Sequence, residues 1–178
     1  RPETEVLVQT VLDWASGRSL RGAELGIGSG CVSLSLLFEI PGMRMIASDV
    51  SEAALQVTRT NAAKFGIGSQ QLTLLQSGGR MFEIFQDQGP LDFIVSNPPY
   101  LSMSDELGPG VANYEPKVAL FSDGDVSAFY LNAAQFFGSL VNETGAGFFE
   151  VPHERASQIE SYFHEFGYQT HLHMDLTG

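Results

Sequence analysis

The sequence has little cysteine and no long apolar run, and each shortage excludes a class of protein. Its 178 residues include a single cysteine, Cys31, which excludes an internal disulfide framework and favours a reducing compartment. No apolar run approaches the roughly 20 residues that a membrane-spanning helix needs. We therefore expect a globular protein with no membrane partner. We expect it in the cytoplasm of a bacterium, or in an organelle if the source is eukaryotic.

Basic residues are also scarce. Lys and Arg together number 9 against 21 Asp and Glu, which gives a formal net charge of −12 at pH 7. Tight nucleic-acid binding draws on phosphate neutralisation by basic side chains, so a direct nucleic-acid partner is disfavoured. With 43% hydrophobic residues, the chain can bury one substantial core, and we expect residues 1–178 to form one domain. The first residue is Arg1, so we expect a segment of a longer protein.

Two hydrophobic periods alternate along the chain, which is typical of α/β proteins. The helical period predicts helices at 2–16, 30–39, 52–65, 126–141 and 153–165. Short apolar runs predict strands at 21–25, 44–49, 71–76, 91–96, 146–151 and 168–174. The alternation predicts a Rossmann-like, doubly wound, mostly parallel sheet with helices on both faces. In such sheets a ligand lies at the carboxyl ends of the strands, so the loops there are the candidate sites.

The first candidate loop is "ELGIGSG", residues 24–30. Its glycines let the backbone approach a ligand closely, and the helix that follows offers unpaired N–H groups. A dinucleotide fingerprint would have a third glycine at position 31, where Cys31 stands, and this weakens an NAD interpretation. We interpret Cys31 as a small buried residue. A plain strand-to-helix turn remains the alternative for this loop.

The second candidate is Asp49, at the end of the strand "RMIASD". A carboxylate at this place and spacing can accept two hydrogen bonds from a ribose diol. The alternative is that Asp49 only caps the next helix, although Ser51 is already a good cap candidate.

The third candidate is "NPPY", residues 97–100, directly after the apolar strand "LDFIVS". The Asn97 carbonyl and a nearby main-chain carbonyl form a pair of acceptors suited to a planar –NH2 group. The prolines fix that geometry, and Tyr100 supplies a flat wall. A simple Asn-Pro turn is the structural alternative.

These motifs together resemble those of a known enzyme class. "ELGIGSG", "SD" at 48–49 and "NPPY" at 97–100 are similar to the motifs of S-adenosylmethionine (SAM)-dependent methyltransferases that act on planar nitrogen. "RPETE" at 1–5 and "NYEPKVAL" at 113–120 resemble the HemK/PrmC family. Members of that family are protein-(glutamine-N5) methyltransferases that act on release factors in translation termination.

The resemblance implies an activity and partners. It implies methyl transfer from SAM, leaving S-adenosylhomocysteine, to the side-chain amide of the glutamine in the Gly-Gly-Gln loop of a class I release factor. We expect a monomer. The family's helical N-terminal domain and final antiparallel strand are expected to lie outside this segment.

The resemblance also assigns roles to individual residues. It implies a cofactor site made by Glu24, Gly26, Gly28, Gly30, Asp49 and Asn97, with the glycine loop at the methionine part and Asp49 at the ribose. It implies catalytic roles for Asn97, Pro98 and Tyr100. It implies substrate binding by Thr4, Glu5, Asn97, Pro98, Pro99 and Tyr100.

Some features leave alternatives open. The acid that contacts adenine in the family would fall near Ser77 to Gly79, where no carboxylate stands. A weakly active or non-catalytic SAM-binding member therefore remains an alternative. An NAD-linked oxidoreductase would share the nucleotide-binding fold, and a nucleic-acid adenine-N6 methyltransferase would share "NPPY", so both also remain alternatives. His171 and His173 share one face of a predicted strand, but no third ligand is in view, and we expect no metal site.

Overall fold

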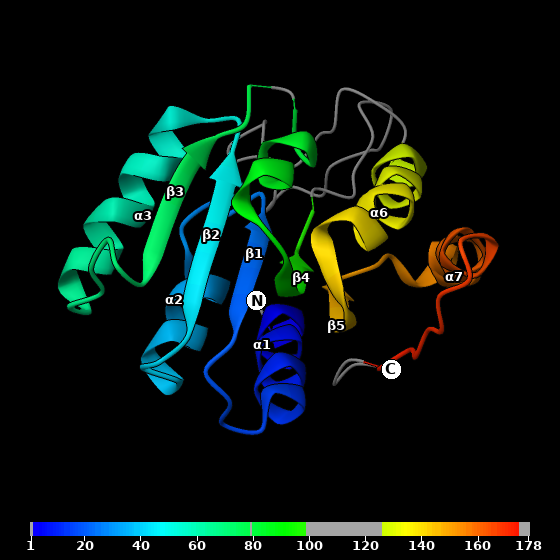
Figure 1. Cartoon of the computed structure of the whole chain (residues 1–178), viewed down its shortest axis with the longest axis horizontal. Helices are drawn as coiled ribbons and strands as arrows, with labels where there is room; N and C mark the ends of the chain where they lie inside the picture. The colour runs from blue at the N-terminus through cyan, green and yellow to red at the C-terminus, as the bar shows by residue number, and fades with distance from the viewer. Residues whose placement is uncertain (1, 79, 99–125, 175–178) are drawn as a thin grey trace, which may run out of the picture. The chain divides into compact units, whose positions relative to one another are not determined.

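The computed structural model describes residues 2–78, 80–98 and 126–174, and this part of the chain holds a five-stranded parallel sheet (Figure 1). The strands are β1 (Arg21–Leu25), β2 (Arg44–Asp49), β3 (Leu72–Gln76), β4 (Leu91–Ser96) and β5 (Val141–Phe149). Their order in the sheet is β3-β2-β1-β4-β5, and every neighbouring pair is parallel. The predicted Rossmann-like α/β class is confirmed.

Helices connect the strands much as the hydrophobic period predicts. The helices are α1 (Pro2–Ala15), α2 (Cys31–Glu39), α3 (Glu52–Lys64), α6 (Val126–Leu140) and α7 (Ala156–Glu165). Two 3-10 turns, η1 (Glu83–Gln88) and η2 (His153–Arg155), complete the described elements. The helix predicted at 153–165 is thus divided between η2 and α7. None of the described helices is long and apolar enough to cross a membrane.

The chain divides into two compact units. The first comprises Arg1–Asn97, Phe137–Glu150 and His173–Gly178, and it contains the whole sheet with α1, α2 and α3. The second comprises Pro98–Phe136 and Val151–Leu172, and it contains α7 and most of α6.

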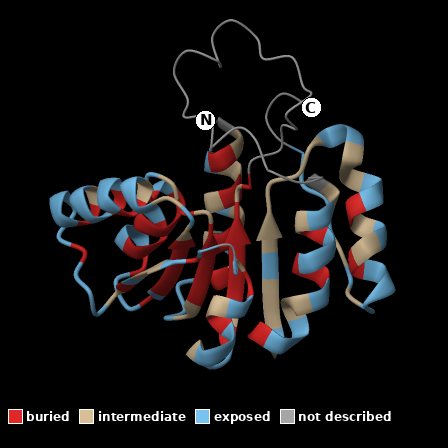
Figure 2. Cartoon of the chain, turned by 90° about the horizontal axis from the view of Figure 1, so that it is seen from above, coloured by how far each residue is buried: buried red, intermediate tan, exposed pale blue. Residues whose placement is uncertain are grey.

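The core of the first unit lies between the sheet and the helices α1, α2 and α3. Its buried members include Leu7, Val11, Val32, Leu36, Met45, Ala47, Leu55, Phe93 and Val95. Figure 2 shows that buried residues are concentrated on the central strands, whereas β5 is mostly intermediate or exposed. Central parallel strands covered by helices read as near-continuous apolar runs, which explains why the sequence predicts them well.

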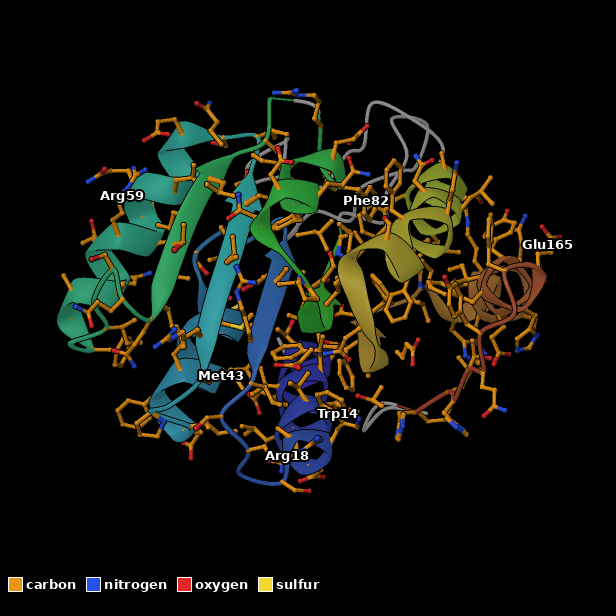
Figure 3. All side chains as sticks on the ribbon, viewed as in Figure 1. Trp14, Arg18, Met43, Arg59, Phe82 and Glu165 are labelled. Atoms are coloured by element: carbon orange, nitrogen blue, oxygen red, sulfur yellow. The ribbon has the colours of Figure 1, made fainter. Side chains whose placement is uncertain are left out.

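An aromatic cluster holds α1 against the sheet. The Trp14 ring, labelled in Figure 3, packs edge-to-face on Phe93 of β4 and Phe148 of β5, with centroid distances of 6.0 and 5.4 Å. The Arg18 guanidinium lies 4.9 Å from the Trp14 ring centroid. A Cβ at Gly22 would lie 2.3 Å from the Phe93 ring, so a larger residue here would displace that ring. The cluster fixes α1 with respect to β4 and β5.

Local signals set the ends of α3. The Ser51 hydroxyl accepts a hydrogen bond from the backbone N–H of Ala54 at 3.3 Å, which confirms the predicted N-cap. Gly66 follows the helix with φ of 70°, a conformation that glycine adopts readily.

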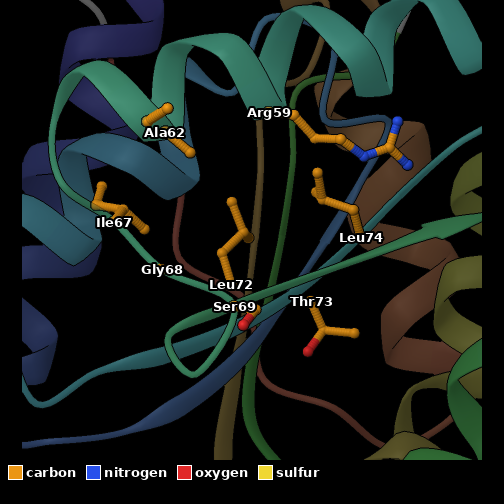
Figure 4. Close-up of a pocket in the computed structure, with 9 residues that line it drawn as sticks. Arg59, Ala62, Ile67, Gly68, Ser69, Leu72, Thr73 and Leu74 are labelled. Atoms are coloured by element: carbon orange, nitrogen blue, oxygen red, sulfur yellow. The ribbon is translucent and has the colours of Figure 1, made fainter.

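A shallow hollow of about 400 Å³ lies between α3 and the edge strand β3 (Figure 4). Its lining includes Arg59 and Ala62 of α3, Ile67, and Leu72 and Leu74 of β3. The lining includes none of the residues that follow the carboxyl ends of the strands, so the hollow is separate from the candidate loops there.

The strand β5 begins earlier than the predicted strand at 146–151. It starts at Val141, with an irregular register where it pairs with the first residues of β4. The Asn142 side chain donates a hydrogen bond to the Asp92 carboxylate at 2.8 Å. A Cβ at Gly145 would lie 2.5 Å from the Asp92 carbonyl oxygen, so only glycine allows this close approach. These tertiary contacts extend the strand through a segment that resembles a turn in sequence.

The strand predicted at 168–174 is wrong, because these residues form no strand. The Thr170 hydroxyl instead bonds back to α7, donating to Glu160 at 2.8 Å and lying 2.8 Å from the His164 ring nitrogen. Leu172 is 49% exposed, so the alternating apolar residues of this segment are not buried against a core. A segment with alternating apolar residues forms a strand only where a neighbouring strand can pair with it and a core can bury its apolar face.

Candidate active site at the carboxyl ends of the strands

The sheet register brings four strand ends to the same level. Leu25 of β1 pairs with Ser48 of β2 and Ser96 of β4, and Ser96 pairs with Phe149 of β5. The next residue along each strand therefore lies in one row at the carboxyl edge: Gly26, Asp49, Asn97 and Glu150. Neighbouring strands are about 4.8 Å apart, so the main chains of β2 and β4 are separated by about 10 Å in this row.

The glycine loop after β1 forms a backbone cradle. The N–H groups of Gly26 and Ile27 both donate to the Ser48 carbonyl at 2.9 Å, which holds the start of the loop against β2. A Cβ at Gly30 would lie 2.9 Å from side chains of α2 and α3, so this glycine is required by packing. Gly26 and Gly28 have φ of 73° and 57°, and a Cβ at either would meet no atom within 4 Å. The loop therefore keeps open space beside these two residues.

Two side chains of α3 that were not among the predicted site residues bind carbonyl groups of the loop. The Thr58 hydroxyl donates to the Gly28 carbonyl at 2.9 Å, and the Asn61 amide donates to the Ser29 carbonyl at 3.0 Å. Residues three apart lie on one face of a helix, and that spacing was the only available signal.

Asp49 connects the glycine loop to the start of α3. One carboxylate oxygen accepts the Gly28 N–H at 2.9 Å, and the other accepts the Ser51 N–H at 2.9 Å. The alternative role of Asp49 at the start of the next helix is thus present. A carboxylate has about four lone-pair sites, so each oxygen keeps acceptor capacity for a further donor. Ribose binding by Asp49 stays a prediction.

Glu24 lies beneath the loop with 2% of its surface exposed. One of its oxygens accepts hydrogen bonds from both the backbone N–H and the hydroxyl of Ser33, in the first turn of α2. Burial is the main cause that raises the pKa of Glu24 to about 8; the two Ser33 bonds oppose the shift, and the charge of Asp49 makes a smaller contribution in the same direction as burial. The observed contacts attach Glu24 to α2. Its predicted role at the methionine part of a cofactor stays a prediction.

Asn97 is held from the side of α1. Its amide nitrogen donates to the Thr4 hydroxyl at 3.0 Å, and that hydroxyl donates to a carboxylate oxygen of Glu150 at 3.3 Å. Thr4, 7% exposed, therefore lies next to the key residue of the "NPPY" motif, whereas Glu5 is exposed on α1. Glu150 was not among the predicted site residues, because its position beside Asn97 follows from the pairing of β4 with β5.

Other predicted site residues are only partly described. Pro98 is buried. Pro99, Tyr100 and the segment 113–120 lie outside the described residues, as does Arg1 of "RPETE".

Two buried hydroxyl groups have no hydrogen-bond partner in the described part of the chain, those of Ser48 and Ser77. Ser77 directly follows β3, is 3% exposed, and donates its backbone N–H to the Asp49 carbonyl at 3.0 Å. It therefore lies beside the predicted ribose acid, in the segment where the family's adenine-contacting acid is missing.

The remaining predictions concern cysteine and histidine. The interpretation of Cys31 as a buried residue is wrong: it is exposed at the first position of α2. His171 and His173 are also exposed. Among the described residues, no group of three or more His, Cys, Asp and Glu side chains is arranged to hold a metal ion.

Comparison with known proteins identifies the family. A family model described as "Methyltransferase small domain" matches residues 2–110. The release factor glutamine methyltransferase of Bordetella pertussis is 33% identical over 181 residues, covering 100% of this chain and 65% of that protein. The bifunctional methyltransferase of Rickettsia bellii is 32% identical over 206 residues, covering 99% of this chain and 36% of that protein. The chain thus spans only part of the length of these relatives.

Solved structures share the fold. A ribosomal protein L11 methylase from Lactobacillus delbrueckii subsp. bulgaricus has a TM-score of 0.69 at 20% identity, covering 96% of this chain and 72% of that one. A SAM-dependent methyltransferase from Agrobacterium tumefaciens has a TM-score of 0.68 at 12% identity, covering 93% of this chain and 50% of that one.

The relatives named release factor glutamine methyltransferase confirm the resemblance to the HemK/PrmC family that the motifs predicted. The match of the family model over residues 2–110 covers the glycine loop, Asp49 and "NPPY". The chain belongs to the methyltransferase small domain family.

Proposed function

We propose that this chain is the catalytic domain of a methyltransferase that modifies a release factor. It would transfer the methyl group of SAM to the side-chain nitrogen N5 of the glutamine in the Gly-Gly-Gln loop of a class I release factor. The observation that carries the proposal is the orientation of Asn97. Its –NH2 group is used by Thr4, which leaves its carbonyl oxygen as the acceptor for a substrate amide.

The residues at the carboxyl edge of the sheet fit SAM. Open space beside Gly26 and Gly28 leaves backbone accessible to the methionine part, and Asp49 has acceptor capacity for the ribose hydroxyls. When bound, SAM supplies an electrophilic methyl group on its sulfonium. A nucleoside at Asp49 and a reacting centre at Asn97 would be separated by two strand spacings, about 10 Å.

The chain's own residues would compensate for a weak nucleophile. An amide nitrogen shares its lone pair with its carbonyl, so it attacks poorly unless it is held in place. The Asn97 side-chain oxygen and the Pro98 carbonyl would accept its two N–H bonds and hold the nitrogen in line with the methyl group. The same two oxygens would stabilise the positive charge that develops on nitrogen during transfer. Pro99 would stiffen this turn, and Tyr100 would pack on the amide plane.

An exocyclic adenine amine offers the same planar –NH2, so a nucleic-acid substrate is the competing interpretation. The 9 Lys and Arg against 21 Asp and Glu oppose it. The names of the relatives also favour a release factor as the substrate.

The test uses the full-length protein, SAM carrying a labelled methyl group, a purified release factor and a nucleic-acid sample in parallel. We expect label on the release factor, none on a variant with alanine in place of the Gly-Gly-Gln glutamine, and none on nucleic acid. Asn97→Ala should lose transfer by a factor on the order of 10²–10³ while keeping SAM affinity, by analogy with oxyanion-hole donors. Equal labelling of the alanine variant, or label on nucleic acid, would contradict the substrate assignment.

A further inference from the structure

We propose that Thr4 and Glu150 are positioning residues that determine which end of the Asn97 carboxamide faces the substrate. The inference rests on the proposed function, because it concerns the acceptor that would hold the substrate amide. It assigns a role to Glu150, which no motif explained.

The direction of the two hydrogen bonds follows from chemistry. A carboxylate accepts hydrogen bonds and cannot donate them, so the Thr4 hydroxyl must give its single proton to Glu150. The Thr4 oxygen then has only lone pairs to offer its other neighbour. The group of Asn97 that faces Thr4 at 3.0 Å must therefore be the –NH2 end. The carboxylate thus sets the orientation of a carboxamide that it does not touch directly.

The frame around these three residues is fixed by independent contacts. Glu150 follows β5, and its backbone N–H donates to the Ser96 carbonyl at 3.1 Å, one residue before Asn97. Thr4 is in the first turn of α1, and Trp14 at the other end of α1 packs edge-to-face against both Phe93 and Phe148. Thr4 is 7% exposed, and its bonds to Asn97 and Glu150 are partly buried, which limits competition from water.

The orientation has a direct consequence for catalysis. With the carbonyl oxygen turned to the substrate, Asn97 accepts an N–H of the incoming amide. With the carboxamide reversed, its –NH2 would face the substrate –NH2, and two donors cannot form a hydrogen bond. Asn side chains have nearly the same shape in both orientations, so only hydrogen-bond partners separate them. The Thr4 and Glu150 pair supplies that distinction.

Three variants separate this role from simple attachment of α1 to the sheet. Thr4→Ser keeps the hydroxyl and is the conservative rescue variant: it should recover most of the kcat that Thr4→Val loses. Thr4→Val removes it, and Glu150→Gln keeps the volume of the side chain but lets the neighbouring hydroxyl bond in either direction. Thr4→Val and Glu150→Gln should each lower kcat by about tenfold, as expected for loss of one charge-assisted orienting bond. The KM for the release factor and the affinity for SAM should change little. Thr10→Val is the matched control, because the Thr10 hydroxyl donates to the Val6 carbonyl within α1 and has no other partner among the described residues.

A second measurement does not depend on the substrate. The side-chain –NH2 signals of Asn97, identified by their loss in Asn97→Ala, should exchange slowly with water in wild type and Thr4→Ser. Exchange should be about tenfold faster in Thr4→Val and Glu150→Gln, because the hydrogen bond that protects these protons is lost or weakened.

The outcomes separate the two proposals. If wild type labels no release factor, the proposed function fails, and the exchange rates alone decide the inference. If wild type is active, wild-type kcat in both Thr4→Val and Glu150→Gln would overturn the inference. Equal loss in Thr4→Ser and Thr4→Val would also overturn it, because packing rather than the hydroxyl would then matter. Unchanged exchange in Thr4→Val would overturn it by itself.

Discussion

A buried carboxyl group beneath the glycine loop makes the stability of this protein depend on pH in a specific direction. Glu24 is buried at the end of β1, and burial raises its pKa from 4.5 to about 8. In the unfolded chain the side chain ionises near its ordinary value. Between these two values the folded state binds one more proton than the unfolded state, so stability falls as pH rises. Replacing Glu24 with glutamine removes the titration and keeps the size of the side chain.

The size of the effect follows from the two pKa values. The maximal slope for one proton is about 1.4 kcal/mol per pH unit. Integrated from about pH 5 to about pH 7.5, with 4.5 for the unfolded and 8 for the folded pKa, the loss is about 3 kcal/mol. This is a substantial part of the roughly 5–15 kcal/mol that stabilises a typical protein. Below the unfolded pKa the full contribution is present, and it is lost as pH rises through the folded pKa.

The measurement is urea unfolding of wild type and Glu24→Gln at a series of pH values. The free energy of unfolding of Glu24→Gln minus that of wild type should increase by about 3 kcal/mol over this range, and any constant difference between the side chains cancels. A difference that does not change with pH would show that Glu24 is ionised in the folded protein. A difference that decreases as pH rises would mean that the pKa of Glu24 is lower in the folded protein than in the unfolded chain.

Three further substitutions test other parts of the account. Asp49→Asn should weaken SAM binding by about 10- to 100-fold in titration calorimetry, because a neutral amide is a poorer acceptor for ribose hydroxyls than a carboxylate; unchanged affinity would remove Asp49 from the cofactor site. Gly22→Ala should destabilise the fold by about 1–3 kcal/mol in urea unfolding, because its Cβ would lie 2.3 Å from the Phe93 ring; a neutral effect would mean that this ring moves freely. Gly78→Asp should tighten SAM binding by about threefold to tenfold, because it adds an acid beside Ser77. Gly78 has open space around it and a φ of 53°, a backbone conformation that aspartate tolerates better than most residues. Weaker or equal binding would show that adenine is not recognised there.

The sequence predicts the central elements well because local and tertiary signals agree there. The strands "RMIASD" and "LDFIVS" are apolar runs between polar turns, and both match β2 and β4 at each end. Ser51 and Gly66 likewise mark the ends of α3 by chemistry that is local to the chain. The prediction for the first part of β5 is wrong because that part depends on a distant partner, Asp92. The strand predicted at 168–174 is wrong because Thr170 bonds back to the preceding helix α7 instead of pairing in the sheet.

The same division holds for the candidate site. Asp49 and Asn97 could be identified because each ends a strand, and parallel strands bring their carboxyl ends to one edge. Ser33, Thr58 and Glu150 could not, since their roles are set by hydrogen bonds to residues 9, 30 and 146 positions away. No local sequence pattern indicates which residue will be the hydrogen-bond partner of these side chains.

The central claim is that Asn97 presents a carbonyl oxygen to a flat amide beside SAM. The most direct test is a crystal structure of the protein with S-adenosylhomocysteine and a peptide containing Gly-Gly-Gln. We expect the Asn97 side-chain oxygen about 3 Å from the glutamine amide nitrogen, with the Asn97 –NH2 still on Thr4 and the ribose at Asp49. A carboxamide turned the other way, or a ligand bound away from the glycine loop, would contradict the account.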